Sequence, residues 1–267
     1  MQRPRLRSRR TKSRSSRDGA CAALLIFAAA LNLGASRCVA EPLAQPLHLE
    51  YRVAWNGISA AGATVSVTPL DLAGHPGVEV EASARTNAFV DVFWSFRGVA
   101  KATFLAAGTE PLHFVYDRTM AGTSYLTMVD FDRGEAGAHS VYVKGRTRRA
   151  LTVEQAGLLD PITAVFRARL SGAKIGDQLV YEIFTGEARY RVQLTVAGPE
   201  AIDVPAGHFA ALRVVPEVWK IGSETERDER LRAATIWVAD DAQRTLLRIR
   251  SEVFIGAVTL DLVKIET

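Results

Sequence analysis

Histidines and acidic residues are the side chains of this sequence that could hold a metal ion or move a proton. The five histidines are scattered, and no two of them lie within five residues of one another: His48, His75, His113, His139 and His208. Local zinc motifs place their ligands a few residues apart, so the sequence predicts no metal and no cofactor, although distant histidines could still converge in the fold. Asp240 and Asp241 follow a predicted strand, where adjacent acids favour a turn over an acid–base pair.

Nucleophilic catalysis also lacks a motif. There is no Gly-x-Ser-x-Gly, and the single Ser-x-x-Lys, Ser171 to Lys174, follows the end of a predicted helix. A Ser–Lys pair needs its serine at the start of a helix, so that both side chains share one face. Both cysteines, Cys21 and Cys38, lie in the first 40 residues. We therefore predict a protein without enzymatic activity, and a hydrolase acting on a glycan or an ester stays open as an alternative.

One basic cluster, Lys144 to Arg149, stands out in the body of the chain. Arginine side chains match phosphate and carboxylate oxygens, so the cluster could contact a lipid headgroup or an acidic polysaccharide. It could equally be a solvated hairpin tip. The candidate ligand-binding residues combine three arginines of this cluster with two residues of a predicted helix: Arg146, Arg148, Arg149, Phe166 and Arg167.

The elements that would position these residues are mainly strands. Apolar residues recur at every second position from Leu47 to Trp55, and Asn56-Gly57 then supplies a turn dipeptide. The same alternation continues at Val65 and Val67 and at Val78 and Val80. Similar runs follow at 100–105, 112–116, 125–131, 140–143, 178–184, 190–196, 209–218, 231–238, 246–253 and 258–265. About a dozen short strands without β-α-β alternation predict a single curled antiparallel sheet, open or spiral and β-barrel-like.

One segment breaks this pattern and predicts a short amphipathic helix. Asp160 is a candidate N-cap, Pro161 fits the first helical position, and Gly172 ends the segment. Ile162, Val165, Phe166 and Leu170 recur at helical spacing, with Arg167 and Arg169 expected on the other side. We expect this helix to cover the concave face of the sheet. A weaker helix candidate spans 88–96, where the residues fit a strand equally well.

The first 40 residues have the layout of a cleaved secretory signal. A basic stretch reaches Arg17, an apolar run covers residues 20–33, and Ala40 ends the segment. Fourteen apolar residues are too few to span a bilayer, so no transmembrane anchor is expected in the mature chain. A twin-arginine route through Arg9-Arg10, acylation of a cysteine, or an uncleaved basic arm are the weaker alternatives. The predicted location is periplasmic or secreted, after cleavage near Ala40.

The charge of the chain changes at this boundary. The whole sequence has a net charge of +4, but nine of its 33 basic residues and only one of its 29 acidic residues lie in residues 1–40. Residues 41–267 therefore carry 24 basic and 28 acidic side chains, which argues against nucleic acid as a partner. This part has no cysteine and reads as one β-rich domain.

Four phrases of the sequence resemble a bacterial exported family known as domain of unknown function 3108. They begin at Tyr51 (Tyr-Arg-Val-Ala-Trp-Asn-Gly), Asp160 (Asp-Pro-Ile-Thr-Ala), Val204 (Val-Pro-Ala-Gly-His-Phe) and Ile236 (Ile-Trp-Val-Ala-Asp-Asp), and together they cover roughly residues 50–262. Thr163 stands where the family usually has serine, and Thr245-Leu246 where a proline-containing pair is expected. The resemblance implies an envelope protein and, by analogy of fold, kinship with curved-sheet lipid carriers.

Export, absent catalytic motifs and a curled sheet with one amphipathic helix lead to a functional hypothesis. We expect a cell-envelope protein that binds a lipid or another apolar ligand in a cavity of the curved sheet. The second hypothesis is a structural or interaction protein that contacts an envelope component through the basic cluster at 144–149.

Overall fold

The computed structural model describes residues 45–132, 137–222, 234–241, 244–253 and 256–266. The predicted export segment lies outside these ranges, so the prediction of a cleaved signal stays a prediction. Within the described residues, no helix is long and apolar enough to cross a membrane.

In these described ranges, fifteen strands form one sheet, in the order β8-β7-β6-β5-β4-β3-β2-β1-β15-β14-β13-β12-β11-β10-β9. Neighbours are antiparallel except for β9 and β10. The strands are β1 Leu47–Trp55, β2 Ile58–Leu72, β3 His75–Thr86, β4 Phe96–Leu105, β5 Glu110–Met120, β6 Thr123–Phe131, β7 Ala138–Lys144, β8 Thr147–Val153, β9 Leu158–Leu159, β10 Gln178–Phe184, β11 Arg189–Val204, β12 Gly207–Ile221, β13 Ala234–Ala239, β14 Leu246–Glu252 and β15 Ala257–Glu266.

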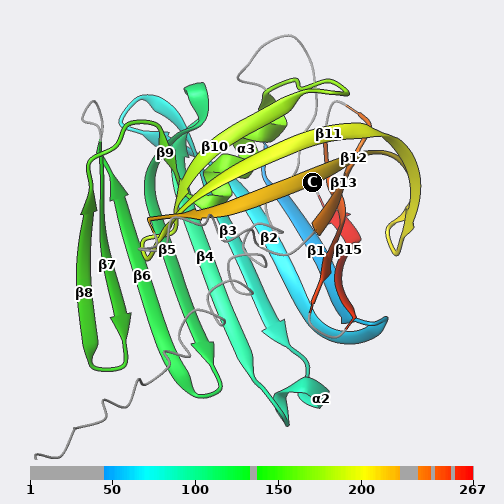
Figure 1. Ribbon diagram of the computed structural model, residues 1–267, viewed down its shortest axis with the longest axis horizontal. Helices are drawn as coiled ribbons and strands as arrows, with labels where there is room; N and C mark the ends of the chain where they lie inside the picture. Colours follow the sequence, from blue (N-terminus) through cyan, green and yellow to red (C-terminus); the bar gives the residue numbers. More distant parts are fainter. Residues whose placement is uncertain (1–44, 133–136, 223–233, 242–243, 254–255, 267) are drawn as a thin grey trace, which may run out of the picture.

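The sheet curls because one face is apolar and buried while the other is polar, and because register shifts interrupt the hydrogen bonding between strands. Along β1, buried Leu47, Leu49 and Tyr51 alternate with polar residues on the outer face. Register shifts occur in five of the strand pairs, and such bulges bend a strand and increase its twist. As a result β10, β11 and β12 arch across the concave side, over the strands of the other half of the sheet (Figure 1).

Helix α3, Pro161–Leu170, fills the inside of this curve. Asp160 caps it as expected: its Oδ1 accepts hydrogen bonds from the backbone N–H groups of Ile162 and Thr163, both at 2.9 Å. The helix contacts β4 on one side and β10 on the other, although these strands are far apart in the sheet. Phe166 packs on Phe104 of β4, with ring centroids 5.4 Å apart. The helix therefore joins two distant parts of the sheet through one apolar core.

A second closure is made by the turn between β10 and β11, residues 185–188, which we call the strap. It lies on the concave face of β6 and β7, where Ser140 Oγ donates to the carbonyl of Gly186 at 2.8 Å. A Cβ atom at Gly186 would lie 2.4 Å from Thr127 Cγ2 and 2.8 Å from Val129 Cγ2. Only glycine allows this approach, and its φ of +83° adds a second reason for glycine.

The structure confirms the curled antiparallel sheet and the helix on its concave face, and it adds detail that the sequence pattern lacked. The cluster 144–149 includes the β7–β8 turn, and β8 is an additional strand. The candidate helix at 88–96 is short, because α2 covers only Ala88–Asp91. A separate 3-10 turn, η2, covers Ala107–Thr109. Arg169 was expected on the outer side of α3, but it is buried.

Candidate functional site

A small cavity lies between α3 and strands β10 to β13. Its volume is about 60 Å³, the space of roughly two water molecules. Apart from two arginines, its lining is apolar: Val165, Ala168, Arg169, Ala173, Leu179, Leu194, Val196, Leu212, Val214, Ile236, Val238 and Arg244. Pockets that hold a complete small-molecule ligand have volumes of roughly 300 Å³ or more, so the described structure has no open cavity of acyl-chain size here.

Arg169 places a cation in the apolar wall of this pocket. Its side chain is only 6% exposed, and its guanidinium lies over the Phe166 ring, 5.6 Å from the centroid. Burial lowers the pKa of Arg169 to about 9, and the group stays protonated at neutral pH because that value is still well above 7. An acidic group that entered the pocket would therefore meet a cation that is little shielded by water.

Arg244 supplies the second cation of the lining and is partly exposed. Its Nη1 donates to Asp240 Oδ1 at 3.1 Å, and its backbone N–H donates to Asp241 Oδ1 at 2.9 Å. These local hydrogen bonds agree with the interpretation of the two acids as turn residues. Arginine is neither a general acid nor a general base at neutral pH, so the polar groups of this lining give no support to hydrolysis.

The carboxyl group of Asp160 is the most perturbed acid on the concave side. It is fully buried, and desolvation raises the pKa of Asp160 to about 6 against the opposing effect of its hydrogen bonds to Thr163 and Ile162. These hydrogen bonds belong to the cap of α3, so the group serves the helix and does not line the pocket.

The far part of the concave side is polar and aromatic. Arg118 of β5 is 6% exposed, and its Nη2 donates to Glu187 Oε1 of the strap at 2.9 Å. Its guanidinium carbon lies 4.6 Å from the Tyr116 ring centroid and 4.9 Å from that of Tyr125. Burial raises the pKa of Tyr116 to about 12. Thr127 also donates to Glu187, at 3.3 Å, so this cluster fastens the strap to the sheet.

The five residues named from the sequence do not form one site. Arg146 in the β7–β8 turn and Arg148 and Arg149 at the start of β8 are exposed, whereas Phe166 is fully buried against Phe104. Arg167 donates to the carbonyls of Gly108 and Thr109 at 3.0 and 2.7 Å, which ties α3 to η2. None of the five lines the pocket, and their role in ligand binding is untested.

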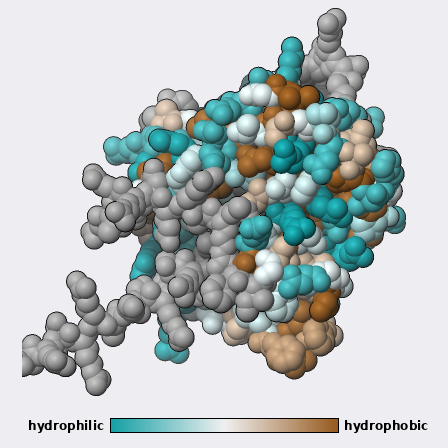
Figure 2. Space-filling model, turned by 45° about the vertical axis from the view of Figure 1, so that its right-hand side comes forward, coloured by the Kyte–Doolittle hydropathy of each residue, from teal (hydrophilic) through white to brown (hydrophobic). Residues whose placement is uncertain are grey.

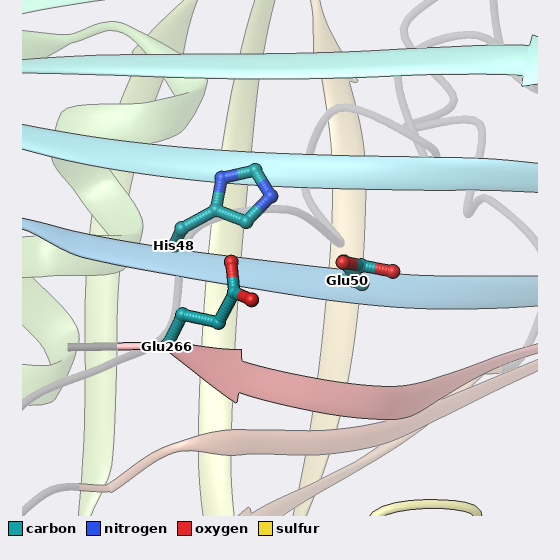
Figure 3. Close-up of side chains that lie close together, drawn as sticks. All are labelled: His48, Glu50 and Glu266. Carbon is teal, nitrogen blue, oxygen red and sulfur yellow. The ribbon is translucent and has the colours of Figure 1, made fainter.

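One group of side chains on the outer face has the composition of a metal site. His48 and Glu50 of β1 and Glu266 of β15 each offer a ligand atom, and these atoms lie within 4.8 Å of one another (Figure 3). His48 Nδ1 is hydrogen-bonded to Ser66 Oγ at 2.9 Å, and Lys264 forms an ion pair with Glu266. A cation would have to compete with that lysine, so these three residues alone do not support a metal centre.

Comparison with a solved structure supports the fold. The chain is similar to a beta-barrel-like protein of domain of unknown function DUF1849 from Brucella abortus, with 10% identity and a TM-score of 0.54, over 84% of this chain and 98% of that one. It is also similar to a protein from Bacteroides fragilis that is described as exported and YmcC-like in fold, with 10% identity, a TM-score of 0.39, and coverage of 83% and 95%.

The comparison with sequence families is more specific than the structural one. No curated protein sequence matches the chain. The family model described as "Protein of unknown function (DUF3108)" matches residues 50–263, which includes all four phrases that suggested the resemblance. By this match over most of its length, the chain belongs to the DUF3108 family.

Proposed function

We propose that this protein is a non-enzymatic, exported binder of an amphiphile, a molecule with an acidic head and an apolar chain. The proposed site is the pocket between α3 and β10–β13. The observation that carries the proposal is the composition of the lining, which is apolar except for Arg169 and Arg244. Apolar walls with a few placed polar groups are typical of ligand sites, and arginine matches carboxylate and phosphate oxygens.

The ligand is larger than 60 Å³, so the pocket has to open. The wall best suited to move is the first part of the connection after α3, residues 171–175, which contributes Ala173 to the lining, because Gly176 is already hydrogen-bonded to Val196 of β11 at 2.8 Å. Gly172 has a φ of +67°, a Cβ atom added there would meet no atom within 4 Å, and Ile175 is 57% exposed. The first half of α3 is buried and capped by Asp160, so the last turn and this connection can move while the rest stays in place.

Mass spectrometry of organic extracts from the purified protein tests the proposal. We expect an acyl lipid to co-purify with the wild-type protein. Ala168→Leu should reduce the bound lipid at least fivefold, because the added side chain occupies much of the pocket. Ala150→Leu, at an exposed position of β8, is the matched control and should retain the lipid.

Two results would reject this function. One is an absence of lipid from the wild-type protein after exposure to a panel of fatty acids and phospholipids. The other is equal lipid content in wild-type and Ala168→Leu protein, since a ligand whose binding is unchanged by this substitution does not occupy the pocket. Thermal unfolding of each variant shows whether a loss of lipid reflects a loss of fold.

A further inference from the structure

Four turns lie at one end of the strands of the sheet. In an antiparallel sheet, successive hairpin turns alternate between the two ends of the strands. The β1–β2, β3–β4, β5–β6 and β7–β8 turns therefore lie at the same end. The pairing of Trp55 with Ile58 closes the β1–β2 hairpin, and the pairing of Lys144 with Thr147 closes the β7–β8 hairpin. Figure 1 shows these turns along the lower end of the molecule, and we call this end the turn edge.

The β3–β4 turn carries an exposed apolar tip, defined here as Phe89, Val92, Phe93 and Trp94. Phe93 is 80% exposed, Val92 77% and Phe89 65%. The neighbouring β1–β2 turn adds Ile58, which is 61% exposed. Figure 2 shows brown hydrophobic surface at the lower end of the molecule, where Figure 1 places α2. Large apolar side chains gathered at one place mark an interaction surface, whereas single exposed ones do not.

The tip is built in a defined shape. Asn87 accepts a hydrogen bond from the backbone N–H of Val90 at 3.0 Å, and its side-chain amide donates to the carbonyl of Ser59 in β2 at 2.7 Å. Asp91, the acid of this turn, forms an ion pair with Arg97 and accepts a hydrogen bond from Thr86. The apolar side chains are thus held outward by polar contacts on the inner side of the turn, and the one local acid is neutralised.

The β7–β8 turn adds positive charge to the same edge. Lys144, Arg146, Arg148 and Arg149 are exposed there. This turn lies four strands from the apolar tip, roughly 19 Å away at about 4.8 Å per strand. The opposite ends of these strands carry acids instead: Asp71, Glu110, Asp130 and Asp132. The basic turn therefore lies at the same end of the strands as the apolar tip, and these four acids lie at the opposite end.

We propose that the turn edge docks on an anionic lipid surface. The apolar tip enters the interfacial layer, and Arg146 and Arg148 contact lipid phosphates. Phe and Trp side chains favour the membrane interface, and basic residues beside an apolar insertion add electrostatic attraction to anionic lipids. The charge pattern selects this partner, since an uncharged apolar partner would gain nothing from the basic turn. The proposal is independent of the pocket beside α3.

Flotation of the purified protein with vesicles tests the docking. Vesicles of phosphatidylethanolamine and phosphatidylglycerol should bind the wild-type protein, and pure phosphatidylcholine vesicles should bind it at least tenfold less. Phe93→Asp should lower binding to the anionic vesicles at least tenfold. Val180→Asp, at a 54% exposed position of β10, is the matched control and should bind like the wild type.

The basic turn is tested by its dependence on salt. Wild-type binding should fall when sodium chloride is raised to about 0.5 M, because salt screens attraction to the phosphates. The double variant Arg146→Glu and Arg148→Glu should bind weakly at every salt concentration, and Arg213→Glu on β12 is its control. All of these positions are exposed, so thermal unfolding should change little.

Three outcomes would overturn the docking proposal. Wild-type protein that does not float with anionic vesicles rejects it, as does equal binding of Phe93→Asp and Val180→Asp. Concentration-dependent self-association that Phe93→Asp abolishes would assign the tip to a second copy of this chain. Lipid extracted from the pocket should be unchanged in Phe93→Asp, so failure of the docking and failure of the proposed function are distinguishable.

Discussion

The concave side of the sheet is closed twice, and the two closures differ in chemistry. Helix α3 lies against the sheet mainly through apolar side chains, with a small pocket beside its last turn. The strap is fastened by Arg118, Thr127 and Ser140 and fits closely around Gly186. Polar contacts and close packing require a specific geometry, whereas apolar contacts are not directional. We infer that the strap holds the curve of the sheet and that the ligand of the proposed function would enter beside α3.

The substitution Gly186→Ala should lower the stability of the folded protein more than the other substitutions that compare the two closures. Its Cβ would lie 2.4 Å from Thr127 Cγ2, and φ at this position is +83°. Overpacking and the left-handed backbone together should lower the free energy of unfolding by about 4 kcal/mol, as measured by urea denaturation.

Gly172→Ala, in the connection after α3, is the control for that experiment. Gly172 also has a positive φ, of +67°, but a Cβ there would meet no atom within 4 Å. Its cost should be about 1 kcal/mol, from backbone conformation alone. Equal losses for the two variants would show that the strap is not closely packed.

The pH dependence of stability tests the α3 side of the comparison. Burial raises the pKa of Asp160 to about 6 in the folded protein, above its ordinary value of 3.8. The folded state therefore holds this proton more tightly than the unfolded state. Stability from this group is fully present below about pH 4 and is lost as pH rises through 6, by roughly 3 kcal/mol.

Asp160→Asn should remove this slope while it keeps an oxygen that caps the helix. Urea denaturation of both proteins between pH 4 and pH 7 measures the difference. A wild-type curve with the same slope as the Asn variant would mean that Asp160 does not titrate in this range.

The ion pair of the strap should contribute less to stability than the close packing around Gly186. Arg118→Met removes the contact with Glu187, whose side chain is 36% exposed and remains hydrated. We expect a loss of about 1 kcal/mol, because solvent screens this pair in part. Hydrogen exchange at 185–188 should become faster in this variant. A loss larger than that of Gly186→Ala would reverse the ranking of polar contacts and close packing in the strap.

The sequence predicted the sheet and the helix because both depend on local patterns. Alternation of apolar residues defined the strands, and the Asp160-Pro161 pair located the start of α3 within one residue. Arg169 was predicted on the wrong side of α3, although its spacing along the helix already indicated the buried side. One helix face with i, i+3, i+4, i+7 spacing contains Ile162, Val165, Phe166 and Arg169. The prediction gave more weight to the charge of Arg169 than to this spacing.

Contacts between distant residues could not be predicted in this way. Arg118 and Glu187 are 69 residues apart, and nothing local relates them. The apolar tip was not predicted for another reason. Residues 88–96 fitted a helix and a strand equally well, and only the fold shows that Phe89 and Phe93 are exposed. The shared edge of the β3–β4 and β7–β8 turns follows from the alternation of hairpins, once the strand order is known.

Hydrogen exchange in the presence of a fatty acid tests the central claim most directly. Oleate should change the protection of backbone amides in 168–179, beside the pocket, and leave the strap at 185–188 unchanged. This result would place ligand entry at α3. Unchanged exchange throughout the protein, or a change confined to the strap, would contradict the account.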